Sequence, residues 1–277
     1  MASSSTKRKI LRQLCERPLR LDSGQEARIT PVGKQMLYVS FVAERWLQGA
    51  PGRQLDFDGG ESERAIVALA EGWSSTAIHA LAREPLTFRE LERAIPHLDP
   101  QGLERRLRMM RISGLVKVRP EGSDTGLYTA TDWLREGIAP LAAAARLERN
   151  EPSQQSAPID SLDVEAAFLL TLPLLELPAE ISGACRLGVE IGEGGQPRST
   201  AGVTAHVEGG RVSSCASRLD DEVGTWAIAS AGDWLDTLID SGARRVRTGG
   251  DRLLANALVG QLHNTLFGIA TGERSLS

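Results

Sequence analysis

The sequence predicts an α+β fold whose two halves differ in character. Helical periodicity dominates the first half, interrupted by one strand–turn–strand pattern, whereas alternating strand patterns precede helices in the second half. The segment "RNEPSQQSAPIDS" (149–161) separates them. It is rich in Pro, Ser and Gln and has no apolar period, which is typical of a linker. We therefore expect residues 151–161 to join separately folded parts.

The composition is that of a globular protein and favours two or three small domains. The chain has 277 residues, of which 41% are hydrophobic and 25% charged, and it has no apolar run long enough to span a bilayer. The N-terminus lacks the pattern of a secretory signal, and three scattered cysteines do not suggest a disulfide framework. These features favour a reducing, cytoplasmic setting with no membrane partner.

The net charge of −4 conceals a gradient along the chain. Residues 1–60 hold 10 basic and 6 acidic side chains, residues 61–158 hold 13 and 14, and residues 159–277 hold 9 and 16. The last part is therefore unsuited to an anionic polymer. Any nucleic-acid contact must come from local basic patches closer to the N-terminus, before residue 159.

The first block, residues 1–60, is predicted to be helical. "KRKILRQLCERPL" indicates a short amphipathic helix. "ITPVGKQMLYVSFVAERWL" (29–47) indicates a longer helix, which Thr30 can cap and Pro31 can open. A second boundary, weaker than the linker and with two Gly-containing turns, follows at 48–62.

The second block, residues 61–150, begins with two helical stretches, "ESERAIVALAEG" and "WSSTAIHALAREP". A third follows, "LTFRELERAIP", in which Thr87 and Glu90 have the spacing of a capping box. Asp99 and Pro100 then cap and open a further helix.

This further helix, over residues 100–113, has two faces of different character. Leu103, Leu107 and Met110 recur at helical spacing and must face the core. Residues 99–119 hold six basic side chains against two acidic ones, within an otherwise neutral block. The face opposite the core carries Gln101, Glu104, Arg105, Arg108 and Arg111.

After Gly114 ends this helix, "LVKVRPEGSDTGLYTAT" (115–131) indicates two strands joined by a Gly-rich turn. Thr131 then begins a helix over 132–148, which Pro140 is expected to kink or split. This order predicts a winged helix-turn-helix whose 100–113 helix enters the DNA major groove, where basic side chains reach phosphates and guanine edges. The predicted DNA-binding residues are Thr87, Arg89, Gln101, Glu104, Arg105, Arg108, Arg111, Lys117 and Arg119.

A set of residues within 70–147 forms a recognisable pattern: Trp73; Pro85, Phe88, Glu90 and Leu91; Leu103, Leu107, Gly114, Leu115 and Val116; and Tyr128 and Thr131. On these residues the segment resembles the HxlR/MarR-type winged-helix transcription regulators. The resemblance implies a dimeric DNA-binding repressor or activator. Glu121 and Asp124 depart from it, because a basic wing tip would suit the minor groove.

The first block looks like an eroded copy of the second. "CERPLRL" echoes "AREPLTF", and "ARITPVGKQML" echoes "LYTATDWLREG", but the helix-turn-helix core and its recognition helix are missing. We therefore expect residues 1–60 to be a degenerate winged-helix half that packs against the second block or builds a dimer. A simple helical hairpin extension is an equally compatible interpretation.

The third block, residues 162–277, is predicted to be α+β. Two strand patterns meet at a hairpin turn over 208–211, and two strand–helix units follow, with Asp251 capping the last helix. The run 225–267 resembles the sterol-carrier-protein-like fold at Trp226, Trp234, Leu235, Gly250, Asp251 and Leu254. The resemblance implies a cavity for a small apolar ligand, lined by Trp226, Trp234, Leu254, Leu258 and Leu262. The alternative is a structural or dimerising domain whose core is filled by its own side chains.

No pattern in the sequence indicates an enzyme, a cofactor or a metal site. The Gly-rich "IGEGGQP" (191–197) lacks the Lys-Ser/Thr of a phosphate loop and is expected to be a hairpin turn. No Asp, Cys or Ser partner stands at a known catalytic spacing from any of the four histidines, His79, His97, His206 and His263.

The sequence therefore predicts a DNA-binding transcriptional regulator that acts as a homodimer on double-stranded DNA. Two other interpretations remain open: a winged-helix adaptor that binds proteins and not DNA, and a carrier of small apolar ligands. Four outward arginines on the 100–113 helix favour the regulator, because an adaptor has no need of them: Arg105, Arg106, Arg108 and Arg111.

Overall fold

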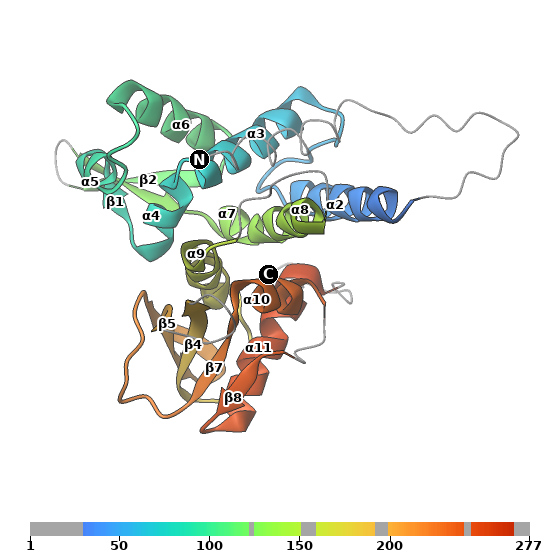
Figure 1. The fold of residues 1–277 in the computed structure, drawn as a ribbon. Helices are drawn as coiled ribbons and strands as arrows, with labels where there is room; N and C mark the ends of the chain where they lie inside the picture. Colours follow the sequence, from blue (N-terminus) through green and yellow to red (C-terminus); the bar gives the residue numbers. More distant parts are fainter. Residues whose placement is uncertain (1–29, 122–124, 151–158, 192–198, 241–244, 269–277) are drawn as a thin grey trace, which may run out of the picture. The chain divides into compact units, whose positions relative to one another are not determined.

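The computed structural model describes residues 30–121, 125–150, 159–191, 199–240 and 245–268 (Figure 1). It has a mixed α+β structure, as predicted, and divides into two compact units, Met1–Ala167 and Phe168–Ser277. The division falls within helix α9 (Ser161–Thr171). The predicted short helix near the N-terminus, the wing tip, and most of the predicted linker and of the Gly-rich turn lie outside the described residues.

Helix α2 (Pro31–Gln48) begins as the sequence predicts. The Thr30 side chain accepts a hydrogen bond from the backbone N–H of Gly33 (3.0 Å), and Pro31 occupies the first turn, where a missing N–H costs nothing. The apolar stripe of the helix packs along α8 (Ile138–Asn150). Its buried members are Val39, Val42, Ala43, Trp46 and Leu47.

Four helices follow in the first unit: α3 (Gly60–Ser74), α4 (Ala77–Arg83), α5 (Phe88–Ala94) and α6 (Pro100–Ile112). Helix α6 packs against α3. The close approach depends on Gly72, because a Cβ atom there would lie 3.0 Å from the side chains of both Ile78 and Met110.

A three-stranded antiparallel sheet completes this part of the unit, in the order β1-β3-β2. The predicted hairpin is present as β2 (Val116–Glu121) and β3 (Thr125–Ala130). Strand β1 (Leu86–Thr87) was not predicted; it pairs with β3 through Leu86 and Tyr128.

The helix that follows the hairpin is split, as predicted, and the split falls at Gly137, three residues before Pro140. The two pieces are α7 (Asp132–Glu136) and α8 (Ile138–Asn150). A Cβ atom at Gly137 would lie 2.9 Å from both the Leu134 carbonyl oxygen and a Leu69 methyl group. Pro140 has no N–H to donate to the carbonyl oxygen of Glu136, four residues earlier, so the hydrogen bond that would continue α7 into α8 is missing and Pro140 lies in the first turn of α8.

The second unit contains a five-stranded sheet in the order β6-β5-β4-β7-β8, in which only the β4–β7 pair is parallel. The predicted β5–β6 turn is present, and Gly209 (φ 54°) and Gly210 (φ 78°) supply the left-handed conformations that such a hairpin requires. The strands are β4 (Gly183–Ile191), β5 (Ser199–Glu208), β6 (Arg211–Ala216), β7 (Trp226–Ser230) and β8 (Arg247–Gly249).

Helices α10 (Ala231–Ile239) and α11 (Arg252–Phe267) pack against β4 and β7 of this sheet, and the short helix η1 (Leu172–Leu174) packs against β6. As predicted, Asp251 caps α11, accepting hydrogen bonds from the N–H groups of Leu253 (2.9 Å) and Leu254 (3.2 Å). The alternate side chains of the central strands are fully buried in the core, namely Cys185, Leu187 and Val189 of β4 and Val203 and Ala205 of β5. None of the helices in the described part of the chain has the length and apolar character needed to cross a membrane.

Candidate nucleic-acid interface

Helix α6 has the two faces that its sequence predicts. The Asp99 side chain caps it by accepting a hydrogen bond from the N–H of Gly102 (2.8 Å). Leu103, Leu107 and Met110 are 1% exposed or less and fix the inner face. The opposite face is exposed along the length of the helix, and its side chains are Gln101, Glu104, Arg105, Arg108 and Arg111.

Arg105, Arg108 and Arg111 form one strip on this exposed face, because residues three apart on a helix are neighbours. No residue in the described part of the chain forms a hydrogen bond or an ion pair with any of the three guanidinium groups. The strip is therefore a row of three exposed cations whose donors are free for an external acceptor.

Arg106 does not belong to this strip, so the expectation of four outward arginines is wrong for this residue. Its side chain is half-buried, and Nη1 lies 3.5 Å from the carbonyl oxygen of Gly102, at the geometric limit of a hydrogen bond. The reason is the helical rotation of about 100° per residue, which turns position 106 away from positions 105 and 108.

Thr87 and Arg89, the predicted DNA-binding residues at the start of α5, differ in whether their side chains are already hydrogen-bonded within the protein. The backbone N–H of Thr87 donates to Glu90 Oε2 (2.7 Å), its hydroxyl lies 2.8 Å from the same oxygen, and the N–H of Glu90 donates back to that hydroxyl (3.3 Å). This is the predicted capping box, and its backbone and side-chain hydrogen bonds lower the pKa of Glu90. Arg89 is exposed.

Lys117 and Arg119 lie on one face of strand β2, because side chains alternate along a strand. Both are exposed, whereas the intervening Val118 and the neighbouring Val116 turn to the other face. Strand β2 follows α6 directly and contacts it. The hairpin thus adds two cations next to the helix that carries the arginine strip.

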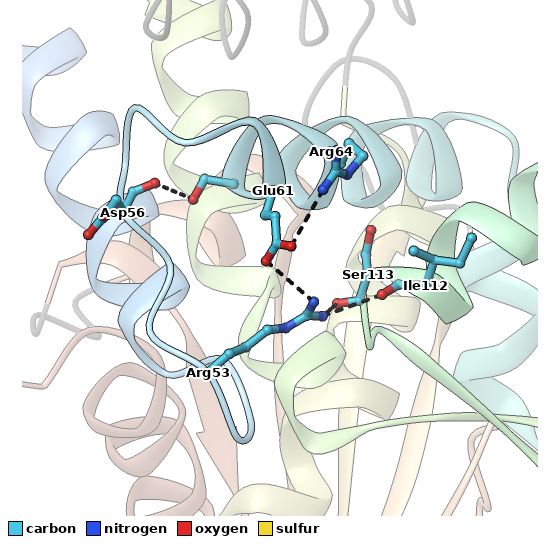
Figure 2. A network of polar contacts seen from close by, with 7 residues as sticks. Arg53, Asp56, Glu61, Arg64, Ile112 and Ser113 are labelled. Atoms are coloured by element: carbon cyan, nitrogen blue, oxygen red, sulfur yellow. Dashed lines mark hydrogen bonds and ion pairs between the residues drawn. The ribbon is translucent and has the colours of Figure 1, made fainter.

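Arg53, which the sequence did not single out, binds the C-terminal end of α6. Its Nη2 donates to the carbonyl oxygens of Ser113 (2.8 Å) and Ile112 (3.4 Å), and Nη1 lies 3.7 Å from Glu61 Oε2 (Figure 2). A lone arginine in a loop, about sixty positions from its acceptors, leaves no periodic signal in the sequence.

A second unpredicted contact set joins α4 to the first half of α9, within the first unit. His79 Nε2 lies 3.1 Å from Asp163 Oδ1, and Arg83 Nη2 lies 3.0 Å from Glu165 Oε1. The His79 ring also packs on Trp73, with ring centroids 4.3 Å apart. The arrangement is a histidine with an acidic partner and an aromatic neighbour, and it contains no nucleophile.

The side chains predicted to line a ligand cavity are not all brought together. Trp234 is fully buried, donates from Nε1 to the Gly188 carbonyl oxygen (2.7 Å) and packs edge-on against Phe168. The three leucines of α11 are equally buried: Leu254, Leu258 and Leu262. Trp226 is half-buried and points to the opposite face of strand β7 from its buried neighbour Ala227.

Within the described residues, no three or more His, Cys, Asp or Glu side chains are grouped so as to hold a metal ion. The Cys185 thiol is buried, and burial raises its pKa to about 12, so it is not a nucleophile at neutral pH. No family model matches the chain, and no curated protein or solved structure is significantly similar to it.

Proposed function

We propose that the chain is a transcriptional regulator that binds double-stranded DNA in a sequence-specific manner, with α6 as the recognition helix. The observation that carries the proposal is the exposed strip of Arg105, Arg108 and Arg111, which have no acceptor within the described chain. Guanidinium groups in such a strip suit phosphate oxygens and the O6 and N7 acceptors of guanine.

The other exposed side chains of the same face can also form hydrogen bonds with the edges of bases. Gln101 can pair with an adenine edge, and Glu104 can accept from the amino group of cytosine. The helix is about 20 Å long at 1.5 Å per residue and is narrow enough to enter a major groove about 12 Å wide. Lys117 and Arg119 on the adjacent hairpin supply phosphate contacts, which position the protein without specifying sequence.

The scaffold supports the proposal. A helical segment, a short strand, two helices and a two-stranded hairpin follow one another in the order expected of a winged helix-turn-helix, and strand β1 closes the sheet against β3. We therefore include the HxlR/MarR-type resemblance in the proposal. Thr87 has a smaller role in it than the sequence suggested, because its hydroxyl is engaged in the cap of α5.

The proposal also includes a homodimer, since winged-helix regulators of this kind bind two-fold sites. The apolar faces of α2 and α8 are largely occupied by each other, so these two helices leave little apolar surface for a second copy. Leu37 (41% exposed) and Phe41 (61%), one turn apart on α2, are the apolar side chains that a second copy would cover.

For the second unit we retain the sterol-carrier-like resemblance as a proposal of lower rank. Its order of strand β7, helix α10, strand β8, Gly250-Asp251 and helix α11 agrees with that resemblance. The buried side chains of Trp234 and the α11 leucines favour a filled core, so we assign no ligand to this unit.

The test begins with selection of bound fragments from genomic DNA by the full-length chain. Specific affinity is then measured for Arg105→Ala/Arg108→Ala and for a control of equal charge change, Arg64→Ala/Arg211→Ala. Both control side chains are exposed and lie on other elements. Each arginine that reads a base is worth about 1–3 kcal/mol, so we expect the test pair to weaken specific binding by about 30-fold or more.

The control pair is expected to weaken binding only slightly. Recovery of no preferred fragment would refute the regulator and favour the adaptor. Equal affinities for the two double variants, both folded by circular dichroism, would show that another surface reads the DNA.

A further inference from the structure

The carbonyl groups at the C-terminal end of α6 are satisfied in two ways. The backbone N–H groups of Ser113, Gly114 and Leu115 donate to the carbonyl oxygens of Met109 (2.9 Å), Arg111 (3.0 Å) and Met110 (2.9 Å), respectively. This is the usual closure of a helix around a left-handed glycine, here Gly114 with φ 83°.

The carbonyl oxygens of Ile112 and Ser113 are bound instead by a side chain from another element. Arg53, in the loop between α2 and α3, donates to both from Nη2, and Figure 2 shows the guanidinium group reaching across to them. A cation at this end of the helix also interacts favourably with the helix dipole.

The loop that carries Arg53 is anchored at both ends. Ala50 and Leu55 are each 6% exposed, and the Ser62 hydroxyl of α3 donates to the Asp56 carbonyl oxygen (Figure 2). The guanidinium group is therefore presented by a packed loop.

Glu61 orients the guanidinium from the other side. Its carboxylate lies 3.7 Å from Arg53 Nη1 and 3.6 Å from Arg64 Nη2, so it is shared between the two arginines. Among the described residues, Arg64 has an ion pair with Glu61 and no hydrogen bond to α6, which makes it a matched control for Arg53.

We propose that Arg53 is a positioning residue for DNA reading: the loop at the end of the first block, between α2 and α3, holds the C-terminal end of the recognition helix. The proposal rests on the DNA-reading role of α6 proposed above. It gives the first block a function of its own: α2 packs on α8, and the loop that follows α2 fixes the helix that carries the arginine strip.

The register of the arginine strip on DNA depends on the position of the α6 axis. Arg105, Arg108 and Arg111 reach base edges only if the helix axis stays within about 0.5 Å of its productive position, and a helix attached through one face can still pivot about its end. The two carbonyl contacts of Arg53 oppose that pivot at the end nearest Arg111.

The test compares Arg53→Ala, Arg53→Lys and Arg64→Ala in the full-length chain. Amide hydrogen exchange at Ser113, Gly114 and Leu115 reports opening of the end of α6, without DNA. Specific and non-specific DNA affinities are measured at one salt concentration, and thermal unfolding checks that each variant is folded.

Loss of hydrogen bonds to a charged donor is expected to speed exchange at these amides by about tenfold or more in Arg53→Ala, with little change in Arg64→Ala. Specific affinity is expected to fall by about tenfold in Arg53→Ala relative to Arg64→Ala, with equal non-specific affinities. Arg53→Lys keeps the charge and is expected to lie between Arg53→Ala and the wild-type chain, both in the exchange rate of these amides and in specific DNA affinity. If Arg53→Ala does not fold, Arg53→Lys against Arg64→Lys gives the same comparison with smaller differences of the same sign.

Equal exchange in Arg53→Ala and Arg64→Ala would overturn the proposal. So would equal specific affinity, or a fall in non-specific affinity as large as that in specific affinity, which would make Arg53 a phosphate contact. A wild-type chain that binds no specific sequence would overturn the proposed function as well, whereas specific binding that survives Arg53→Ala would overturn the positioning role alone.

Discussion

The two tryptophans that join α2 to α7 form a reciprocal pair whose worth can be measured. The indole Nε1–H of Trp46 donates to the carbonyl oxygen of Trp133, and the Nε1–H of Trp133 donates to that of Trp46, both at 2.8 Å. The rings are stacked, with centroids 4.6 Å apart. We expect Trp133→Phe to keep most of the stacking and to lose one of the two hydrogen bonds.

The expected loss of stability in Trp133→Phe depends on what the Trp46 carbonyl oxygen still binds after the substitution. The Trp46 carbonyl oxygen also accepts from the N–H of Gly49 (3.1 Å), so the substitution leaves no unsatisfied acceptor and the lost hydrogen bond costs about 1 kcal/mol. The smaller ring leaves a partial cavity that costs about 1–2 kcal/mol more. The free energy of unfolding should therefore fall by about 2–3 kcal/mol.

The control is Trp73→Phe in the same unit. Trp73 is 8% exposed, and its indole N–H has no hydrogen-bond partner among the described residues, so only the loss of ring size applies. Urea unfolding followed by circular dichroism measures both variants. Equal destabilisation within about 0.5 kcal/mol would refute the claim that the reciprocal hydrogen bonds tie the first block to the second.

Three further outcomes are expected. Phe41→Glu places a charge on the exposed apolar turn of α2 and should convert the proposed dimer to a monomer in light scattering, whereas a dimer of unchanged affinity would move the interface elsewhere. Brief exposure to N-ethylmaleimide at pH 7 should label Cys215 well before Cys185, because burial raises the Cys185 pKa to about 12; peptide mapping checks the order. Thr87→Ala should cost about 1 kcal/mol at pH 7. Because the folded-state pKa of Glu90 is lowered, its contribution is present above its ordinary pKa of 4.5 and lost as the pH falls below it, so melting curves at pH 3 should show a smaller effect of Thr87→Ala.

Features that depend on adjacent residues were predicted well from the sequence. Caps at Thr30, Thr87 and Asp99 follow from a side chain and an N–H three positions later, and the structure has all three hydrogen bonds. The buried stripes of α6 and α11 follow from helical periodicity in the same way.

Features that depend on distant parts of the chain were not predicted. Strand β1 is two residues long, too short for any period, and exists because β3 offers it an edge. Pro140 predicted that the 132–148 helix would be split but not that the split would fall at Gly137, where the space is limited by Leu69, far away in the sequence. The contacts of Arg53 and His79 likewise cross about sixty and eighty positions.

The composition of α6 helps to choose between the DNA reader and the protein adaptor. Arg105, Arg108 and Arg111 stand at successive intervals of three, and like charges at this spacing destabilise a helix by about 0.2–0.5 kcal/mol per pair. Glu104 is the one acidic side chain on that face, and it forms no ion pair with them in the described chain. Glu104 stands four residues before Arg108 and offsets part of this repulsion, so the helix carries two like-charged pairs against one opposite pair, although it is well capped and its inner face is fully buried. A polyanion removes that repulsion when it binds and releases its own counterions, so the same three residues that weaken the free helix strengthen the complex. A neutral protein surface offers no such compensation, which supports the proposed DNA partner over a neutral protein partner.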